Sequence, residues 1–518
     1  MTDRLSSELF QRLFARVTIS PDTRETSSVK APFTGEPIAD VPLCRAEDVD
    51  LAIKRARLAQ TSWATTPYKK RAEVVLRFHD MVLDQQEEIL DLIQLESGKA
   101  RRHALEEVLD AAIVSRHYAF HGEKLLQPTR RRGALPALTA TWEHHHPLGV
   151  VAFISPWNYP FSLAVTDAIP ALLAGNAVVL KPDQLTPFSA LYGVELLDKA
   201  GLPQDLFQVV TGRGRELGKP LIQQSNYICF TGSTETGRSI AQQAGAALID
   251  CSLELGGKNP MIVLDDAPLN RALDGGVRAC FTNSGQLCIS VERLYVQEGI
   301  YERFVPAFIE LVRSMKLSAG FDYETEMGSL ISQEQFDKIK GHVDDAVSKG
   351  ATIAAGGKAR PDLGPLFYEP TVLTGVTETM KVAREETFGP VVSIYKFAST
   401  EQAVSLANDT LYGLNASIWT GNTEAGRRLA LQIQAGTVNI NEAYAAAWAS
   451  VDAPMGGFKQ SGLGRRHGDY GILKYTEPQT VAVQRLIPIA PSLGMTQESY
   501  ARNMIKALRV LRRSPGVR

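Results

Sequence analysis

Cysteine is scarce in this chain, and its positions exclude a disulfide framework. Five Cys occur in 518 residues, at positions 44, 229, 251, 280 and 288, an odd number at irregular spacings. Such usage is typical of a protein kept in a reducing compartment, so we expect a cytoplasmic protein. No two of these cysteines have the spacing of zinc ligands, and we predict no metal site.

Long apolar runs and an excess of one charge are also lacking. No segment approaches the roughly 18 apolar residues that a membrane span needs, and the N-terminus carries no signal-peptide pattern. Lys and Arg number 55 against 57 Asp and Glu, which gives a net charge of −2. This balance gives no support to nucleic acid or an anionic membrane as a partner.

Short apolar runs alternate with helix-length segments through most of the chain. The runs 150–154, 177–180, 207–210 and 227–230 are typical of buried strands, and 162–174, 187–199 and 219–224 between them suit helices. This alternation predicts an α/β fold with a doubly wound parallel sheet. A second alternating block from about 260 to 440 predicts a second α/β lobe, with Glu254 near the junction.

The two ends of the chain add helical segments. Residues 49–63 and 69–97 read as helices that cover the first lobe. Residues 499–513 are amphipathic and basic, which fits a solvated face, a subunit contact or a helix on a membrane surface.

Three turn-rich segments carry the parts of an acyl-transfer site. Cys288 lies in Phe281–Ser290, Glu254 lies between apolar residues and a Gly-Gly pair, and Asn158 lies in a proline-bracketed turn. A thiol nucleophile, a carboxylate base and an amide donor suit chemistry through a thioester.

A candidate phosphate-binding turn follows the run 227–230. Gly232 and Ser233 begin a G-S-x-x-x-G pattern ahead of a helical segment, where backbone N–H groups can receive a pyrophosphate. An ordinary turn with Ser233 as helix cap is the alternative. Lys181 ends a neighbouring strand, and Glu386 is a second candidate for a ribose.

The chain resembles the aldehyde dehydrogenase superfamily in seven ordered motifs. They are PWNYP (156–160), the run from Lys181, FTGS (230–233), ELGGK (254–258), GQLC (285–288), ETFGPV (386–391) and PMGGFKQSGLG (454–464). The matches extend from about residue 30 to 480 and are most similar to the actinobacterial, NADP-linked succinate-semialdehyde dehydrogenases of the second type.

The resemblance implies a role for each matching residue. Cys288 attacks the aldehyde, Asn158 and the Cys288 N–H hold the oxyanion, and Glu254 activates the hydrolytic water. The positions where the family contacts its dinucleotide are Ile154, Trp157, Asn158, Lys181, Gln184, Gly232, Ser233, Leu255, Glu386 and Phe388.

The resemblance also implies a domain plan and an assembly. It places a coenzyme domain in 1–128 and 148–255, a catalytic domain in 256–456, an oligomerisation element in 129–147 and 470–490, and a tail in 491–518. A homodimer or homotetramer is expected.

Departures from the family pattern bear on coenzyme and substrate. Many members have Glu where this chain has Gln184, so we expect NADP to be used, with NAD possible. The Arg pair that grips a substrate carboxylate in related enzymes is replaced by Thr166 and Thr282. Arg466 either replaces that anchor or lies on the surface.

The expected reaction is oxidation of an aldehyde, with succinate semialdehyde as the first choice. An aromatic or medium-chain aldehyde is the alternative, favoured by Tyr444 and Trp448 near the expected tunnel mouth. Two other classes of function are CoA-acylating aldehyde oxidation and a non-catalytic structural or binding role. Retention of Glu254 speaks against the former, and retention of Cys288, Glu254 and Asn158 against the latter.

Overall fold

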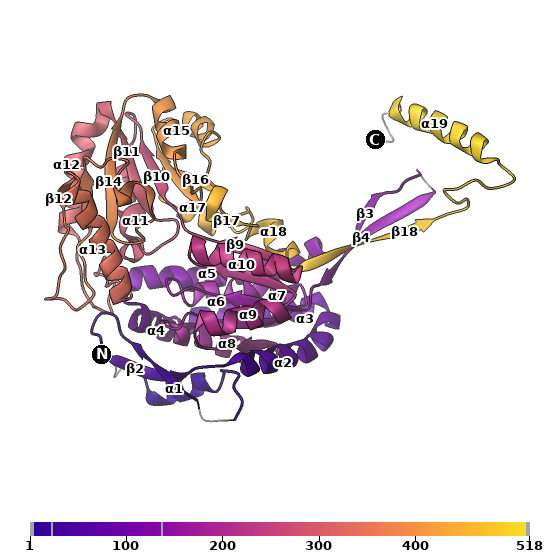
Figure 1. The fold of residues 1–518 in the computed structure, drawn as a ribbon, viewed down its shortest axis with the longest axis horizontal. Helices are drawn as coiled ribbons and strands as arrows, with labels where there is room; N and C mark the ends of the chain where they lie inside the picture. Colours follow the sequence, from indigo (N-terminus) through magenta and orange to yellow (C-terminus); the bar gives the residue numbers. More distant parts are fainter. Residues whose placement is uncertain (1–4, 22–23, 136–137, 514–518) are drawn as a thin grey trace.

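A computed structural model describes residues 5–21, 24–135 and 138–513, and its strands form two large sheets, a three-stranded arm and a short hairpin (Figure 1). The hairpin joins β1 (Thr26–Lys30) to β2 (Pro37–Pro42). Two mostly parallel sheets with covering helices are the α/β architecture that the alternating pattern predicts.

The first large sheet has six strands in the order β17-β9-β8-β5-β6-β7. Strands β5 to β9 pair in parallel, and β17 adds an antiparallel edge next to β9. All four strands predicted in this region are confirmed; β9 and β17 were not predicted. The bounds are β5 (Val150–Ile154), β6 (Ala177–Lys181), β7 (Phe207–Val209), β8 (Tyr227–Thr231), β9 (Asp250–Glu254) and β17 (Gly462–Leu463).

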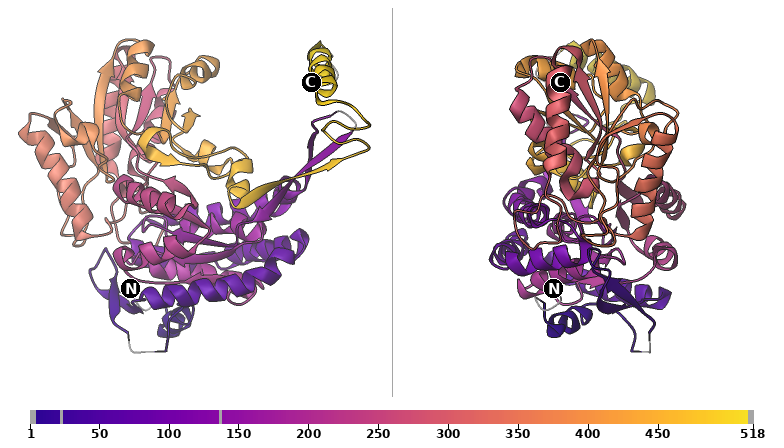
Figure 2. Two further views of the ribbon diagram at one scale, coloured as in Figure 1. Left: turned by 45° about the vertical axis from the view of Figure 1, so that its right-hand side comes forward. Right: turned by 90° about the vertical axis from the view of Figure 1, so that its left-hand side faces the viewer.

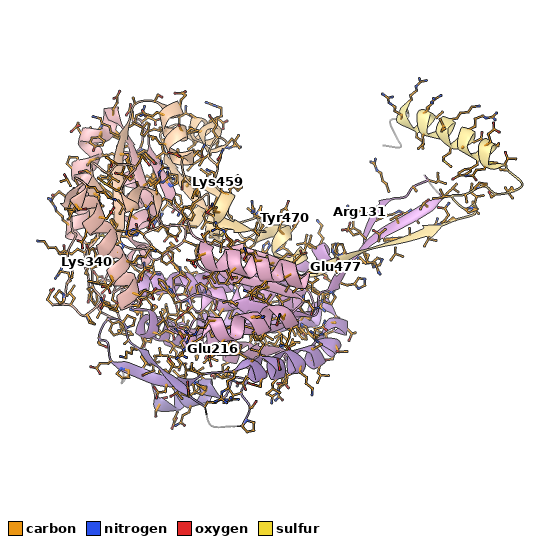
Figure 3. The ribbon with its side chains drawn as sticks, in the orientation of Figure 1. Arg131, Glu216, Lys340, Lys459, Tyr470 and Glu477 are labelled. Carbon is orange, nitrogen blue, oxygen red and sulfur yellow. The ribbon has the colours of Figure 1, made fainter. Side chains whose placement is uncertain are left out.

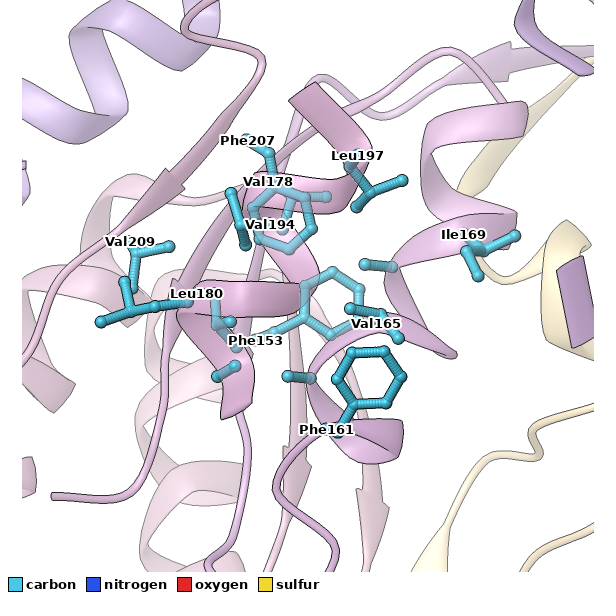
Figure 4. Packing of buried hydrophobic residues seen from close by; sticks show 14 of the residues in the cluster. Phe153, Phe161, Val165, Ile169, Val178, Leu180, Val194, Leu197, Phe207 and Val209 are labelled. Carbon is cyan, nitrogen blue, oxygen red and sulfur yellow. The ribbon is translucent and has the colours of Figure 1, made fainter. Parts of the chain in front are cut away.

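Helices from the N-terminal region and from the crossovers pack around this sheet (Figure 2). They are α1 (Ser7–Phe14), α2 (Ala46–Thr65), α3 (Tyr68–Asp84), α4 (Gln86–Ser97), α5 (Arg101–Leu126), α6 (Ser162–Val165), α7 (Ala168–Leu173), α8 (Pro187–Lys199), α9 (Gly214–Gln224) and α10 (Thr234–Ala247). The buried side chains of β5, β6 and α8 interdigitate in the core between the layers (Figure 4).

Two predicted helices are each divided in the structure, so both predictions are wrong in detail. The segment 69–97 breaks at Gln85, whose φ of −102° and ψ of 20° lie outside the helical region. The segment 162–174 divides into α6 and α7, and Pro170 is part of the reason. Proline has no N–H to donate to the carbonyl of residue 166, so the helical ladder is interrupted there.

The second large sheet has seven strands in the order β12-β13-β14-β11-β10-β15-β16. All neighbours pair in parallel except β12 and β13. The strands are β10 (Asn259–Val263), β11 (Val291–Gln297), β12 (Thr352–Ala355), β13 (Thr371–Thr374), β14 (Val391–Phe397), β15 (Asn415–Trp419) and β16 (Thr437–Ile440). The chain leaves the first sheet at Glu254 and enters the second at Asn259, so the predicted place of Glu254 at the junction is confirmed.

The helices of the second block are α11 (Leu269–Phe281), α12 (Glu298–Ser314), α13 (Gln333–Ser348), α14 (Lys381–Arg384), α15 (Thr400–Asn408), α16 (Thr423–Ala430), α17 (Ala445–Ala449) and α18 (Gly468–Leu473). Two short turns follow: η2 (Thr282–Gly285) comes just before Cys288, and η3 (Lys459–Ser461) comes just before β17.

The three-stranded arm projects from the body and carries the C-terminal helix at its far end (Figures 1 and 3). It consists of β3 (Thr129–Arg132), β4 (Thr139–Pro147) and β18 (Thr476–Gln484), in the order β18-β4-β3. Every β18 residue after Thr476 is exposed. The amphipathic basic tail forms helix α19 (Gln497–Arg513), and none of its residues is buried.

Candidate active site

Cys288 lies at the end of a tightly turned segment between α11 and β11. Asn283 and Ser284 have φ values of 52° and 55°, in the left-handed region that non-glycine residues rarely adopt. Such residues cost about 1–3 kcal/mol each and persist where the surroundings hold them. The side chain of Asn259 holds this segment, since its Nδ2 donates to the carbonyls of Cys288 at 2.8 Å and Ser290 at 2.7 Å.

A cavity of about 420 Å³ opens at the junction of the two large sheets, and Cys288 and Glu254 both line it. Every residue predicted for the site lines this cavity except Ile154 and Lys181. The predicted residues in its wall are Trp157, Asn158, Gln184, Gly232, Ser233, Glu254, Leu255, Cys288, Glu386 and Phe388. The structure therefore brings together segments that lie far apart in the sequence.

Ile154 and Lys181 lie at the carboxyl ends of β5 and β6, paired with each other in register. Lys181 is only 5% exposed, and its Nζ donates to the carbonyl of Pro182 at 3.0 Å. Burial lowers the pKa of Lys181, and Asp183 opposes this shift. These strand ends are the edge at which doubly wound sheets bind ligands.

Glu254 ends β9, where pairing with Gly462 of β17 fixes its backbone. Burial raises the pKa of Glu254 to about 7, and the nearby Arg466 opposes this rise. Burial also raises the pKa of the Cys288 thiol to about 12, with Glu254 adding to the effect. At neutral pH the thiol is therefore protonated, and a carboxylate able to take a proton lies in the same cavity.

Asn158 follows β5 and presents its side-chain amide toward the nucleophile segment. Its Nδ2 donates to the carbonyl of Gln286 at 3.1 Å, and its own carbonyl accepts from Asn283 Nδ2 at 3.1 Å. A primary amide has two N–H donors, so one bond to Gln286 fixes the group and leaves the second N–H for a ligand. This is the arrangement that an oxyanion donor requires.

The carboxylate of Glu386 lies against the backbone of the turn between β9 and β10. Its Oε1 accepts from the N–H of Gly257 at 2.7 Å. A Cβ at Gly256 would lie 2.4 Å from Glu386 Oε2, so a larger residue there would displace this carboxylate. Burial, with Glu292 adding to it, raises the pKa of Glu386 to about 7. Phe388, with a φ of 56°, packs edge-on against Trp157, and both rings line the cavity.

The turn after β8 has the geometry of a helix cap. Ser233 Oγ accepts from the N–H of Thr236 at 3.3 Å, so the capping role considered for Ser233 is confirmed. Gly232 and Ser233 also line the cavity, which places the N-terminus of α10 at its wall. A helix N-terminus attracts anions, so the cap does not exclude a phosphate at this position.

Several cavity residues were not predicted from the sequence. Ser332, Glu334, Gln335 and Lys338 come from the start of α13, whose sequence carries no motif that marks it. Asn259 follows the ELGGK motif directly, but its support of Cys288 depends on a contact with a segment about 30 residues away in the sequence. Long-range contacts of this kind leave no local pattern in the sequence.

The residues that depart from the family pattern at 166, 282 and 466 have hydrogen-bond partners within the protein. Arg466 is 5% exposed, so the alternative of a surface position is wrong. Its Nη2 donates to Thr166 Oγ1 at 2.9 Å and lies 3.5 Å from Asp167 Oδ2. Thr282 is engaged as well, because its Oγ1 accepts from Tyr444 at 3.0 Å. Tyr444 is buried.

The cavity fits a nicotinamide dinucleotide better than a metal ion. Glycines at close approaches, a helix N-terminus and a carboxylate beside Gly257 suit the phosphates and riboses of such a coenzyme. Over the described ranges, no group of three or more His, Cys, Asp or Glu side chains could hold a metal ion. Nor is any helix in those ranges long and apolar enough to cross a membrane.

Comparison with known proteins identifies the class. The model of the aldehyde dehydrogenase family matches residues 19–481, and the chain belongs to this family. It is an enzyme that oxidises aldehydes.

The relatives are similar over nearly their whole length. A protein of Mycolicibacterium smegmatis named, by inference, a succinate-semialdehyde dehydrogenase [NADP(+)] is 51% identical over 508 residues, 98% of each chain. A Mycobacterium tuberculosis protein with a name of the same kind is 49% identical over 514 residues, 99% of each chain. Betaine aldehyde dehydrogenase from Staphylococcus aureus, solved with NAD+, has a TM-score of 0.88 and 33% identity, covering 95% of this chain and 99% of that one.

Proposed function

We propose that this enzyme oxidises succinate semialdehyde to succinate with NADP as coenzyme. The observation that carries the chemistry is the convergence of Cys288, Glu254 and Asn158 on one cavity. The relatives named for succinate semialdehyde and NADP are about half identical to this chain over nearly its full length, which supports the choice of substrate and coenzyme.

The proposed reaction divides into two covalent steps at Cys288. The Cys288 thiol loses its proton to solvent water and its sulfur bonds to the aldehyde carbon, so the carbonyl oxygen becomes an oxyanion that accepts from the Asn158 amide and the Cys288 N–H. A bound nicotinamide coenzyme would supply the acceptor for the hydride that leaves this carbon, which would leave a thioester on Cys288. Glu254 then takes a proton from the water that attacks the thioester, and the carboxylate product leaves with the thiol restored.

Gln184 is proposed to decide between the two coenzymes. Gln184 lines the cavity and carries no charge to repel a 2′-phosphate. We expect Gln184→Glu to shift kcat/KM toward NAD by about tenfold or more, because a carboxylate beside a phosphate costs Coulomb energy and accepts a 2′-hydroxyl well. Initial rates with NAD and NADP measure the shift. A wild-type enzyme that prefers NAD a hundredfold would contradict the role of Gln184.

The far end of the substrate is proposed to be held without the usual Arg pair. Arg466 is the nearest buried cation to Thr166, but it already pairs with Asp167, so its attraction for a second carboxylate is reduced. We therefore expect a high KM for succinate semialdehyde and partial acceptance of other ω-carboxy aldehydes. Comparing kcat/KM for succinate semialdehyde, butanal and benzaldehyde checks this. Equal or better values for the uncharged aldehydes would favour the aromatic or medium-chain alternative.

The proposed domain bounds agree with the division into sheets, and the three-stranded arm is the proposed subunit contact. Strands β5 to β9 fall within 148–255, β10 to β16 within 256–456, and the arm within 129–147 and 470–490, which supports the proposed division. The arm exposes Val481 and Val483 on a strand with an open edge, a surface that a second copy would cover in the proposed dimer or tetramer. Five free cysteines fit the proposed cytoplasmic location.

A further inference from the structure

A lysine and a glutamate outside the family motifs quoted above lie directly behind the Asn158 turn. Lys99 and Glu107 form a hydrogen-bonded ion pair at 2.6 Å, and both side chains are fully buried. Buried ion pairs contribute little to stability on balance, because removing both charges from water costs about as much as their attraction returns. The location of this pair therefore calls for another explanation.

Lys99 connects this pair to the turn that carries Asn158. Its Nζ donates to the main-chain carbonyl of Asn158 at 2.7 Å, and it lies 3.8 Å from the ring centroid of Tyr159. The same carbonyl also accepts from Asn283 Nδ2, which comes from the nucleophile segment. The Asn158 peptide is thus held from two sides, by Lys99 and by the segment that leads to Cys288.

Glu107 holds the other end of the same turn. Its Oε2 accepts from the N–H groups of Phe161 at 2.8 Å and Ser162 at 2.9 Å, at the start of α6. A carboxylate at a helix start satisfies N–H groups that have no partner within the helix. Lys99 and Glu107 therefore fix both ends of the turn 158–162 and do so through charged hydrogen bonds, which are stronger than neutral ones.

The sequence places Lys99 where its backbone is also fixed. Gly98 ends α4 with a φ of 74°, and its carbonyl accepts from the N–H of Ser329 at 2.9 Å. A Cβ at Gly98 would lie 2.2 Å from Ser329 Oγ, so glycine is required here. This turn between α4 and α5 directs Lys99 into the interior toward Asn158.

We propose that Lys99, held by Glu107, is a positioning residue that aligns the side-chain amide of Asn158 with the developing oxyanion. The inference rests on the proposed role of Asn158. A shift of the Asn158 carbonyl would turn the whole peptide and move the amide away from Gln286 and from the reacting oxygen. An oxyanion donor must be aligned within a few tenths of an ångström to act, so the loss falls on kcat.

The test is a double-mutant cycle between this pair and Asn158. Lys99→Met alone would leave Glu107 buried without a cation, so it is combined with Glu107→Gln, whose amide oxygen still accepts from residues 161 and 162. We expect Asn158→Ala to lower kcat about 10²-fold or more, as loss of one oxyanion donor does, and the Lys99→Met/Glu107→Gln enzyme to lose about tenfold or more. In the Asn158→Ala background the pair replacement should change kcat less than about twofold, because linked residues are not additive.

A second buried pair supplies the matched control. Arg24 and Asp48 are also buried and lie 2.8 Å apart, and neither lines the cavity. Arg24→Met/Asp48→Asn should lower the melting temperature and leave kcat within about twofold of wild type. Coenzyme affinity, measured by fluorescence titration, should be unchanged in both pair variants.

The possible outcomes separate the two proposals. Full activity of Asn158→Ala would refute the oxyanion role of Asn158 itself. A large effect of Asn158→Ala together with an undiminished effect of the Lys99 replacement in that background would refute the positioning role alone. Equal loss of kcat in the Arg24 control would assign the effect to stability and overturn the inference.

Discussion

Replacement of Cys288 by alanine is expected to abolish aldehyde oxidation, with a loss of kcat on the order of 10⁶-fold, as is typical when a covalent nucleophile is removed. Among the described residues that line the cavity, Cys288 is the one cysteine, and a thioester can form only on a cysteine thiol. Steady-state rates of coenzyme reduction measure this loss. Coenzyme binding should persist, because the groups proposed to hold it remain in place.

Cys280 provides the control for the Cys288 replacement. It lies eight residues earlier in the chain, on α11, is 1% exposed, and burial raises its thiol pKa well above the ordinary value. A small buried thiol of this kind acts as a core residue. Cys280→Ala should keep kcat and lower stability by about 1 kcal/mol, the scale expected for a small core truncation. Activity retained in Cys288→Ala, or lost in Cys280→Ala with the fold intact, would contradict the assignment.

Replacement of Glu254 by glutamine is expected to separate the two covalent steps. The first step should still release about one equivalent of reduced coenzyme per active site, since Cys288 and Asn158 are unchanged. Turnover should then fall by about 10²–10⁴-fold, the usual contribution of a general base. Stopped-flow absorbance of the reduced nicotinamide resolves the burst from the slow phase. Turnover close to the wild-type rate would show that another group activates the water.

The pH dependence of hydrolysis is a second measurement that separates the wild-type enzyme from Glu254→Gln. With a pKa of about 7, Glu254 is protonated below that pH and gains its charge above it. Hydrolysis in the wild-type enzyme should therefore rise as the pH increases through about 7, because only the carboxylate accepts a proton. Glu254→Gln should lose this rise, since the amide does not titrate.

The segments of regular alternation could be predicted closely from the sequence. Strand β5 and helix α8 begin and end where the pattern indicates. Strand β5 is clear because buried parallel strands read as continuous apolar runs. Strand β17 could not be predicted, because two residues of an irregular segment become a strand only by pairing with β9. The helix break at Gln85 could not be predicted either, because no proline or glycine lies near this position in the sequence.

The candidate site divides in the same way. Cys288, Glu254 and Asn158 stand in segments whose composition indicates chemistry, and the fold places all three at one cavity. Lys99, Glu107 and Asn259 support those residues through contacts between distant elements. A buried lysine on its own looks like any surface lysine in the sequence, so its role becomes visible only with its partners in place.

The most direct test of acyl transfer through Cys288 is the mass of the Glu254→Gln enzyme during turnover. After mixing with NADP and succinate semialdehyde, the intact protein should gain the mass of one succinyl group, and peptide mapping should locate it on Cys288. Treatment with hydroxylamine should remove it, as expected for a thioester. An enzyme that produces the burst of reduced coenzyme but carries no adduct, or carries it on another residue, would contradict the account.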